Sequence, residues 1–431
     1  MADAHTTELT RGEQMLVLAT AFLGWLMAGT NMAIVPLAGR SVALSLGGQT
    51  GEGSVGWWFA AFTCAFLLGA AAGGLLFGAL GDRIGRVKAM GHSILCYSLF
   101  SLAAYFVTSP EQFLVLRFLA CLGVGGIWPN GVALASEAWA NVSRAMLSGL
   151  IGTAANVGFM VLSLAAIVYP ITVESWRWVM VFSATPALLG LFVLWAVPES
   201  RVWLAARSGS AKKDTAQGAT VESAKPAVGE VFRPPLLKLT LLGILLGAIP
   251  LMGNWGSANW LVPWAGQVGE ADGGASLKAW TQWSKSGGAA VGSLLGGWLA
   301  CQFGRRAVYF LISLCSLAIS SYIFWNLKPG DPHFLWWSAA IGFVGTVYFG
   351  WLPLYLPELY PTRVRATGTG VTFNFGRVAT AAGVLAAGQL MAATGGDYAR
   401  MGRITCLVYV LGLVIICFAP DTSKKRLDES G

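Results

Sequence analysis

The stretch that decides the fold is Gly78-Ala-Leu-Gly81-Asp82-Arg83-Ile-Gly85-Arg86-Val-Lys88, a short charged turn between two long apolar segments. A weaker copy lies half the chain further on and reads Gly297-Trp-Leu-Ala-Cys301-Gln-Phe-Gly304-Arg305-Arg306. Gly78 and Gly85 recur in the copy at one offset, whereas Cys301 stands in the place of Asp82. A basic turn repeated at half the chain length predicts a membrane protein built from two similar halves, as many transporters are.

The composition excludes a soluble globular protein. The 431 residues are 55% hydrophobic and 11% charged, and the mean hydropathy is +0.64, whereas soluble domains carry about 25% charged residues. Apolar runs of about 20 residues recur along the chain, and each is long enough to cross a bilayer as a helix. The sequence therefore predicts an all-α polytopic membrane protein.

We expect twelve membrane spans. They run near residues 15–36, 54–79, 89–108, 112–136, 146–170, 176–197, 236–264, 279–301, 307–326, 334–357, 367–392 and 402–419. The polar stretch between the sixth and seventh spans predicts a cytoplasmic linker with little fixed structure. The predicted units are an N-terminal six-helix bundle (1–197), the linker (198–235) and a C-terminal six-helix bundle (236–431).

The basic residues predict the orientation of the chain. Nineteen of the 28 Lys and Arg residues fall on the side shared by the termini and the linker, six fall on the opposite side, and three lie within spans. Cytoplasmic loops carry an excess of Lys and Arg. We therefore expect a multi-pass protein of the cytoplasmic (inner) membrane with both termini in the cytoplasm.

Polar residues repeat between the two halves as well. The matches that share a second, nearly equal offset include Glu137 with Glu358, Arg144 with Arg365, and Asn156 with Arg377. Several polar matches at nearly one offset predict two pseudo-symmetric six-helix halves in parallel orientation.

Four motifs in chain order carry a resemblance to a known family. They are the turn from Gly78 to Arg86, Arg117-Phe-Leu-Ala-Cys-Leu-Gly123-Val-Gly125 in the fourth span, Pro198-Glu199-Ser200-Arg201-Val-Trp203-Leu204, and Pro357-Glu358-Leu-Tyr-Pro361-Thr-Arg363-Val-Arg365-Ala-Thr-Gly368. Together they resemble the major facilitator superfamily, and especially its sugar porters and its metabolite:proton symporters, which include carriers of aromatic acids and sialic acid. The resemblance implies two bundles that rock about a central site.

The chain also departs from these branches at two places. Sugar porters usually carry a Gln-Gln pair in the seventh helix, and residues 245–264 contain none. Acid:proton symporters often carry an acidic residue in the first helix, whereas residues 24–33 contain no carboxylate. The substrate and the coupling ion therefore stay open at this point.

The deep charges of the spans are all basic. A charge at the centre of a bilayer costs about 2.5–3.5 kcal/mol on insertion scales, so each requires a reason. Arg117 and Lys285 could extend their stems to the outer interface. Arg377 is near the midplane, where it could bond to helix carbonyls or to Asn374. The alternative that we favour is that Arg377, with or without Lys285, binds an anionic group of the substrate through parallel hydrogen bonds.

Amides within the spans are further candidates for substrate binding. They either bind substrate hydroxyls or tie helices together, because an unpaired amide in a membrane is costly. Trp255 and Asn259 are spaced i, i+4 and would share a helix face, which suits a ring stacked on indole. The predicted substrate site comprises Asn31, Arg117, Asn156, Trp255, Asn259, Lys285, Asn374 and Arg377.

Charged residues at the cytoplasmic ends of the spans predict a gate. Ion pairs among them would hold the inner ends of the helices together while the cavity faces outward, and their release would let the halves rock. The alternative is that the arginines serve only to set topology. The predicted gate residues are Gly78, Asp82, Arg83, Gly85, Arg86, Glu137, Arg144, Glu199, Arg201, Arg305, Glu358 and Arg365.

These observations predict a secondary transporter, not an enzyme, for a small polar metabolite that is an organic acid or a sugar acid. Protons are an open partner, with Glu137 or Glu358 as the carrier, and a neutral sugar facilitator or exchanger is the alternative. A solute sensor without turnover is a second alternative. The three histidines are scattered and no phosphate-binding loop occurs, so we expect no metal, no cofactor and no nucleic acid. We expect a monomer in the lipid bilayer.

Overall fold

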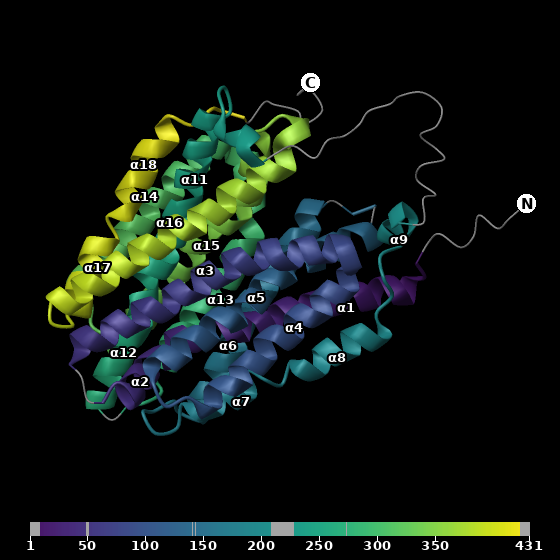
Figure 1. The fold of residues 1–431 in the computed structure, drawn as a ribbon. Helices are drawn as coiled ribbons and strands as arrows, with labels where there is room; N and C mark the ends of the chain where they lie inside the picture. The colour runs from purple at the N-terminus through teal and green to yellow at the C-terminus, as the bar shows by residue number, and fades with distance from the viewer. Residues whose placement is uncertain are drawn as a thin grey trace, which may run out of the picture.

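A computed structural model describes residues 9–48, 51–139, 141–142, 144–207, 228–272 and 274–422. Long helices run side by side through the molecule (Figure 1). The helices of the first half gather on one side of the bundle and those of the second half on the other. The predicted all-α fold is therefore confirmed.

The described part of the first half is built from α-helices joined by short turns. They are α1 (Arg11–Met32), α2 (Ile34–Leu46), α3 (Glu52–Ile84), α4 (Arg86–Ala103), α5 (Pro110–Ala138), α6 (Arg144–Val168), α7 (Arg177–Phe182) and α8 (Ala187–Ala196). A 3-10 turn η2 (Ala104–Phe106) extends α4. Two pairs of these helices, α1 with α2 and α7 with α8, each make one predicted span.

The second half repeats this pattern. Its helices are α11 (Leu237–Leu251), α12 (Leu261–Ala271), α13 (Leu277–Phe303), α14 (Arg305–Asn326), α15 (Phe334–Glu358), α16 (Arg365–Ala393), α17 (Tyr398–Thr405) and α18 (Val408–Cys417). Two short segments, η4 (Met252–Ser257) and η5 (Ala258–Trp260), connect α11 to α12, and η6 (Thr362–Val364) precedes α16.

Eleven helical segments of the described chain are long and apolar enough to cross a membrane. The remaining predicted span, the eighth (279–301), corresponds to α13, which has 27 residues but is less apolar. Its reduced hydropathy follows from polar side chains within it, among them Lys278, Gln282 and Lys285. A helix of this length with buried polar groups is expected to line a protein interior rather than to face lipid.

The same close helix contact occurs in both halves. Helix α3 packs along α5 in the first half, and α13 packs along α15 in the second. A Cβ atom on Gly73 would collide with the carbonyl oxygen of Leu122, and one on Gly292 would collide with that of Phe343. The separation between these two glycines equals that between Gly78 and Gly297, so the offset of the charged turn is also the offset of the backbone packing.

The two halves meet along a small set of helices. Helix α16 packs against α3, and α13 packs against α6, so each half contributes the equivalent pair. Helices α2 and α12 also touch across the interface. This exchange of equivalent contacts is the pseudo-symmetry that the repeated sequence predicts.

The two ends of the bundle differ. We call the end that carries the start of α1 and α9 (Arg201–Arg207) the linker end, and the end that carries α2, α7 and α12 the loop end (Figure 1).

The predicted linker contains ordered pieces where we expected little fixed structure. Besides α9, a 3-10 segment η3 (Val228–Phe232) is present, and Val231 is fully buried. The indole N–H of Trp203 donates to the carbonyl of Asp82 at 2.9 Å, which attaches α9 to α3. Residues 208–227 lie outside the described part.

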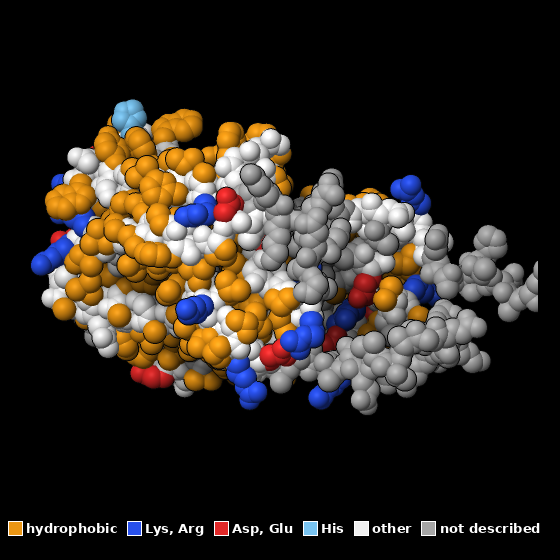
Figure 2. Space-filling model, turned by 90° about the horizontal axis from the view of Figure 1, so that it is seen from above, with side chains coloured by type: hydrophobic (Ala, Val, Ile, Leu, Met, Phe, Trp, Pro, Cys, Tyr) orange, Lys and Arg blue, Asp and Glu red, His pale blue; other side chains and the backbone are white. Residues whose placement is uncertain are grey.

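Large apolar side chains cover much of the surface. Trp195, Leu188 and Phe418 are each more than 70% exposed, and broad hydrophobic areas occupy the face seen in Figure 2. Exposed apolar surface on this scale suits contact with lipid chains.

Candidate functional site

The seventh span is broken near its middle. Helix α11 ends at Leu251, a π-helical turn (η4) follows, and a 3-10 turn (η5) leads into α12. Pro250 and two glycines, Gly253 and Gly256, lie in or beside the break. The prediction that Trp255 and Asn259 share one face of an α-helix is therefore wrong, because neither residue lies in α-helix.

Trp255 forms an aromatic contact between the two halves. Its ring lies 4.5 Å from that of Phe66 on α3 and 6.3 Å from that of Phe159 on α6, measured between centroids. An indole that a π-helical turn places against two rings of the opposite half offers a flat, apolar wall. Short π-helical turns within membrane helices often mark functional sites.

Arg377 lies one helical turn away from this wall. Its Nη1 donates to the carbonyl of Ala70 at 3.2 Å, and Ala70 follows Phe66 by one turn of α3. The guanidinium also lies 4.8 Å above the ring of Phe373 on its own helix. Its recorded partner is thus a helix carbonyl of the other half, and not Asn374, whose amide donates to Gly370.

Lys285 and its neighbours on α13 are buried polar groups. Lys285 is 7% exposed. One turn before it, the amide of Gln282 donates to Ser286 at 2.7 Å, while its carbonyl oxygen is buried without a hydrogen-bond partner. The prediction from sequence did not include Gln282, although a Gln one helical turn from a Lys within a predicted span could have indicated it.

Two more of the predicted amides lie at or near the interface. The Asn156 amide on α6 donates to the carbonyl of Ala289 on α13 at 3.4 Å. The Asn259 amide nitrogen is buried without a hydrogen-bond partner. A functional role is one explanation for a buried polar atom of this kind.

Arg117 and Asn31 form a separate pair inside the first half. Arg117 is 2% exposed, and its Nη1 and Nη2 donate to the side-chain and main-chain oxygens of Asn31 at 2.8 and 3.2 Å. Asn31 in turn donates to Ser101 at 2.6 Å. Arg117 therefore does not extend to the membrane surface, because an internal amide and carbonyl hold its guanidinium.

None of the three deep cations is neutralised by a carboxylate within the part of the chain that the structure describes. The ion pairs recorded there involve other basic residues. Arg377 and Lys285 come from helices that pack on the other half, whereas Arg117 bonds within its own half. An anion entering between the halves beside Trp255 would thus meet the Arg377 guanidinium next to an aromatic wall.

The predicted gate residues of the first half cluster around Arg86 and the start of α4. Asp82 accepts from Arg86 at 2.6 Å, and Glu137 lies 3.8 Å from the same guanidinium. Glu199 accepts from the main-chain N–H of Val87 at 3.1 and 3.2 Å. Glu199 therefore binds the start of α4 rather than Arg201, which begins α9 and is exposed.

The second half has a comparable cluster. Glu358 is 4% exposed and accepts from Arg305 at 2.8 and 3.3 Å and from the hydroxyl of Thr422. Glu358 thus pairs with Arg305, and a bond recorded for Arg365 goes to the carbonyl of Tyr360 at 3.4 Å.

The remaining gate residues occupy the turns and helix ends around these clusters. Gly85 and Gly304 have φ angles of +110° and +84°, which glycine adopts readily. Gly78 has open space around it, Arg83 is exposed, and the side chain of Arg144 lies outside the described residues. The gate bonds described above each lie within one half.

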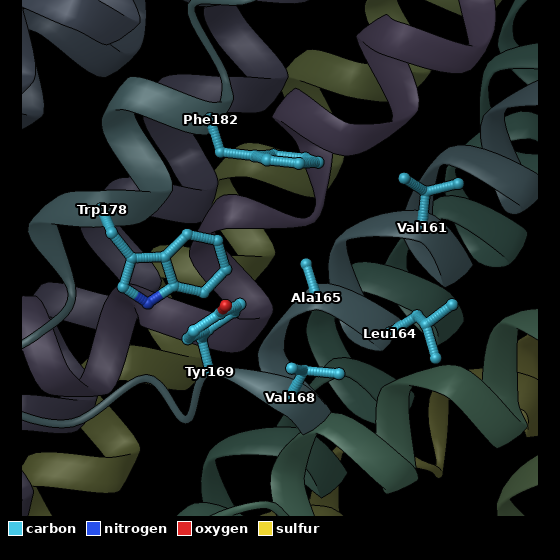
Figure 3. Close-up of a pocket in the computed structure, with 7 residues that line it drawn as sticks. All are labelled: Val161, Leu164, Ala165, Val168, Tyr169, Trp178 and Phe182. Atoms are coloured by element: carbon cyan, nitrogen blue, oxygen red, sulfur yellow. The ribbon is translucent and has the colours of Figure 1, made fainter.

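A groove on the outside of the first half has a different character (Figure 3). It has a volume of about 470 Å³ and lies between α6 and α7, where Tyr169, Trp178 and Phe182 line it with aliphatic side chains. The lining is almost wholly apolar, and Val168 and Tyr169 are exposed on the surface. It therefore suits a lipid chain and not a polar metabolite.

Comparisons with known proteins identify the family. A sequence model of the Major Facilitator Superfamily matches residues 16–384. The chain belongs to this superfamily. Its fold is that of the superfamily too: the xylose transporter XylE from E. coli, in a partially occluded inward-open conformation, superimposes with a TM-score of 0.73 at 16% identity, over 96% of this chain and 100% of that one.

Relatives in the superfamily are similar over most of their length. The 3-(3-hydroxy-phenyl)propionate transporter of Escherichia coli is 26% identical over 98% of both chains. The cis,cis-muconate transport protein of Acinetobacter baylyi is 27% identical over 84% of both. The niacin transporter of the same organism is 25% identical over 84% of this chain and 85% of its own. The protein is thus a multi-pass membrane transporter of small molecules and not an enzyme.

Proposed function

We propose that the protein carries a small planar organic acid across the cytoplasmic membrane by alternating access. The observation that carries this proposal is that Arg377, which bonds to the other half, and Lys285, buried on the interface helix α13, have no carboxylate partner in the described chain. A cation held inside a membrane protein is costly unless a counter-charge compensates it. The carboxylate of the substrate would supply that charge whenever the site is loaded.

The aromatic wall supports the planar character of the substrate. The indole of Trp255 contacts rings from α3 and α6, so a flat molecule could insert along it with its carboxylate toward Arg377. The names of three relatives, which specify hydroxyphenylpropionate, muconate and niacin, describe flat molecules with carboxylate groups. A neutral sugar has support only from the likeness of the fold.

We propose that the linker end faces the cytoplasm and that the bundles 1–197 and 236–431 rock about the site. The excess of basic residues on that side supports the orientation. The ion pairs of Arg86 and Arg305 at this end each form within one half and do not join the halves. This suits a state in which the cytoplasmic ends of the two bundles are apart. In the opposite state we expect these groups to exchange partners across the halves.

We further propose that transport runs as exchange or facilitated diffusion without protons. Of the carboxylates considered for proton transfer, Glu137 lies 3.8 Å from Arg86 and Glu358 bonds to Arg305, so both lie at the linker end rather than near Arg377. Carrier-containing vesicles with a trapped pH dye test this point. We expect the carrier to take up a labelled acid while the internal pH changes no more than in vesicles without carrier. Acidification of the interior in step with carrier-dependent uptake would refute transport without protons.

Matched pairs of ligands test the substrate class. Each candidate acid, such as nicotinate or 3-phenylpropionate, is compared with its own primary amide by thermal shift of the purified protein. We expect at least one acid to raise the melting temperature and its amide to have no effect, because only the acid carries the charge that Arg377 would bind. Equal shifts by acid and amide, or a shift by xylose alone, would refute the proposal.

A further inference from the structure

A buried network of charges lies at the loop end, far from the candidate site. Arg40 on α2 pairs with Glu52, the first residue of α3, and with Glu270 on α12. Lys278 on α13 lies 3.8 Å from Glu270 and donates to the hydroxyl of Ser41 at 3.0 Å. Arg40 is 7% exposed and Lys278 is 3% exposed. Long cationic side chains are seldom this buried unless they are paired.

The network joins the two halves at three points. The Arg40 guanidinium reaches Glu270 of the second half, and the Lys278 ammonium reaches Ser41 of the first. The third point is the hydroxyl of Tyr398 on α17, which donates to Glu52 at 3.3 Å. Helices α2 and α3 of one half are thereby tied to α12, α13 and α17 of the other.

The backbone is close-packed around these charges. A Cβ atom on Gly53 would lie 3.1 Å from the Cα of Ala392, so α3 and α16 are in near contact one residue after Glu52. The rings of Phe59 and Trp260 meet at 5.0 Å a short distance deeper. The loop end is therefore closed by both ionic and apolar contacts between the halves.

The charges are distributed so that the network can divide without leaving a lone charge. If the halves separate here, the first half retains Arg40 with Glu52, and the second half retains Lys278 with Glu270. Each remainder contains one cation and one carboxylate. Breaking a buried ion pair is strongly unfavourable when one partner stays unpaired, and this arrangement avoids that penalty in both halves.

We propose that these residues form the outer gate of the transporter. The Arg40–Glu270 pair, with the Lys278–Ser41 and Tyr398–Glu52 hydrogen bonds, holds the loop end closed, and separation along this line opens the carrier to the outside. A permanent tie between the halves could be made of apolar contacts at lower cost. Two ion pairs that each persist within one half suit a contact between the halves that breaks and returns in every cycle.

A distance measurement between spin labels tests the gate without any substrate. Labels are attached to Glu111→Cys, at the start of α5, and His333→Cys, beside the start of α15, in a background whose exposed cysteines are replaced by alanine. Both positions are exposed at the loop end, and they belong to different halves. Pulsed electron spin resonance then gives the populations of the short (closed) and long (open) distances.

We expect Arg40→Gln and Glu270→Gln each to raise the ratio of long to short distances about threefold to tenfold, since each removes a charge-assisted bond between the halves. The double variant should resemble the single ones, because both remove the same contact. Arg177→Gln is the matched control: this loop-end arginine donates to the carbonyls of Tyr105 and Val107 within its own half, and its distances should equal those of the unmodified protein.

Variants that keep the charges guard against misfolding. Ser41→Ala and Tyr398→Phe each remove one hydrogen bond between the halves and leave every ion pair intact, so we expect smaller shifts in the same direction. The proposal is overturned if folded Arg40→Gln and Glu270→Gln give unchanged distances, or if Arg177→Gln shifts them equally. Because no substrate is added, this outcome does not depend on whether the carrier binds an organic acid.

Discussion

Replacing Arg377 by Ala should weaken the binding of the carboxylate substrate about 100-fold. The guanidinium has five N–H donors, and one recorded bond, from Nη1 to Ala70, uses a single donor. Enough donors remain for two parallel bonds to a carboxylate. Hydrogen bonds to charged groups contribute about 1.5–3 kcal/mol each. Two bonds at the lower value give about 3 kcal/mol, which corresponds to about a 100-fold change in Kd.

Arg377→Lys separates charge from geometry. Lysine keeps the charge but loses the planar fork, so we expect it to retain one of the two bonds and to weaken binding about tenfold. The assay is calorimetric titration of the purified protein with the acid that gives the largest thermal shift. Uptake into vesicles should fall in the same order.

Arg403 provides a matched control for this experiment. Like Arg377, it donates to one helix carbonyl, that of Phe324 at 2.8 Å, and stacks on a ring, that of Trp325 at 4.3 Å. It lies on α17 at the loop end, and these two contacts are with α14 of its own half. Arg403→Ala should bind the acid with unchanged Kd. If Arg377→Ala binds within threefold of the unmodified protein, the assignment of Arg377 to the substrate carboxylate is refuted.

Three further predictions concern stability and are read as melting temperatures in detergent. Gly85→Ala should lower the melting temperature, because the φ of +110° and the closeness of the Glu199 carboxylate both disfavour a Cβ atom. Gly78→Ala is the control and should leave the melting temperature unchanged, because Gly78 has open space around it. Glu358→Gln should cost about 1.5–3 kcal/mol because it weakens the charge-assisted bonds between Arg305 and a carboxylate that is only 4% exposed, whereas Asp82→Asn, at a side chain 55% exposed, should cost less than about 1 kcal/mol. Gly292→Val should prevent α13 from packing on α15 and should reduce the yield of folded protein. If Gly85→Ala, Glu358→Gln or Gly292→Val melted at the temperature of the unmodified protein, the contact assigned to that residue would be wrong.

The arrangement of spans was predictable because its signals are local. Apolar length, the two charged turns and the basic bias are each contained within a few residues of sequence. The repeat offset was visible in Gly78 and Gly297, and the same offset relates Gly73 to Gly292, which set the helix contacts. The repeat in the sequence was therefore enough to predict that the same helix contact occurs in both halves.

The pairing of polar groups was not predictable in the same way. Arg117 bonds to Asn31, which is 86 residues away, and Arg40 bonds to Glu270, which is 230 residues away. Such partners are chosen by which helices become neighbours, and a charge at the end of a span is too common to draw notice. The π-helical turn around Trp255 was missed because only tertiary packing selects it over a regular α-helix.

The division of the loop-end network has an electrical consequence. Each half carries away a pair of zero net charge, Arg40 with Glu52 or Lys278 with Glu270. Moving an elementary charge across the membrane is worth about 2.3 kcal/mol per 100 mV, but opening this end displaces no net charge. The membrane potential should therefore act on the carrier mainly through the charges of Arg377, Lys285 and the bound acid, and not through the loop-end network.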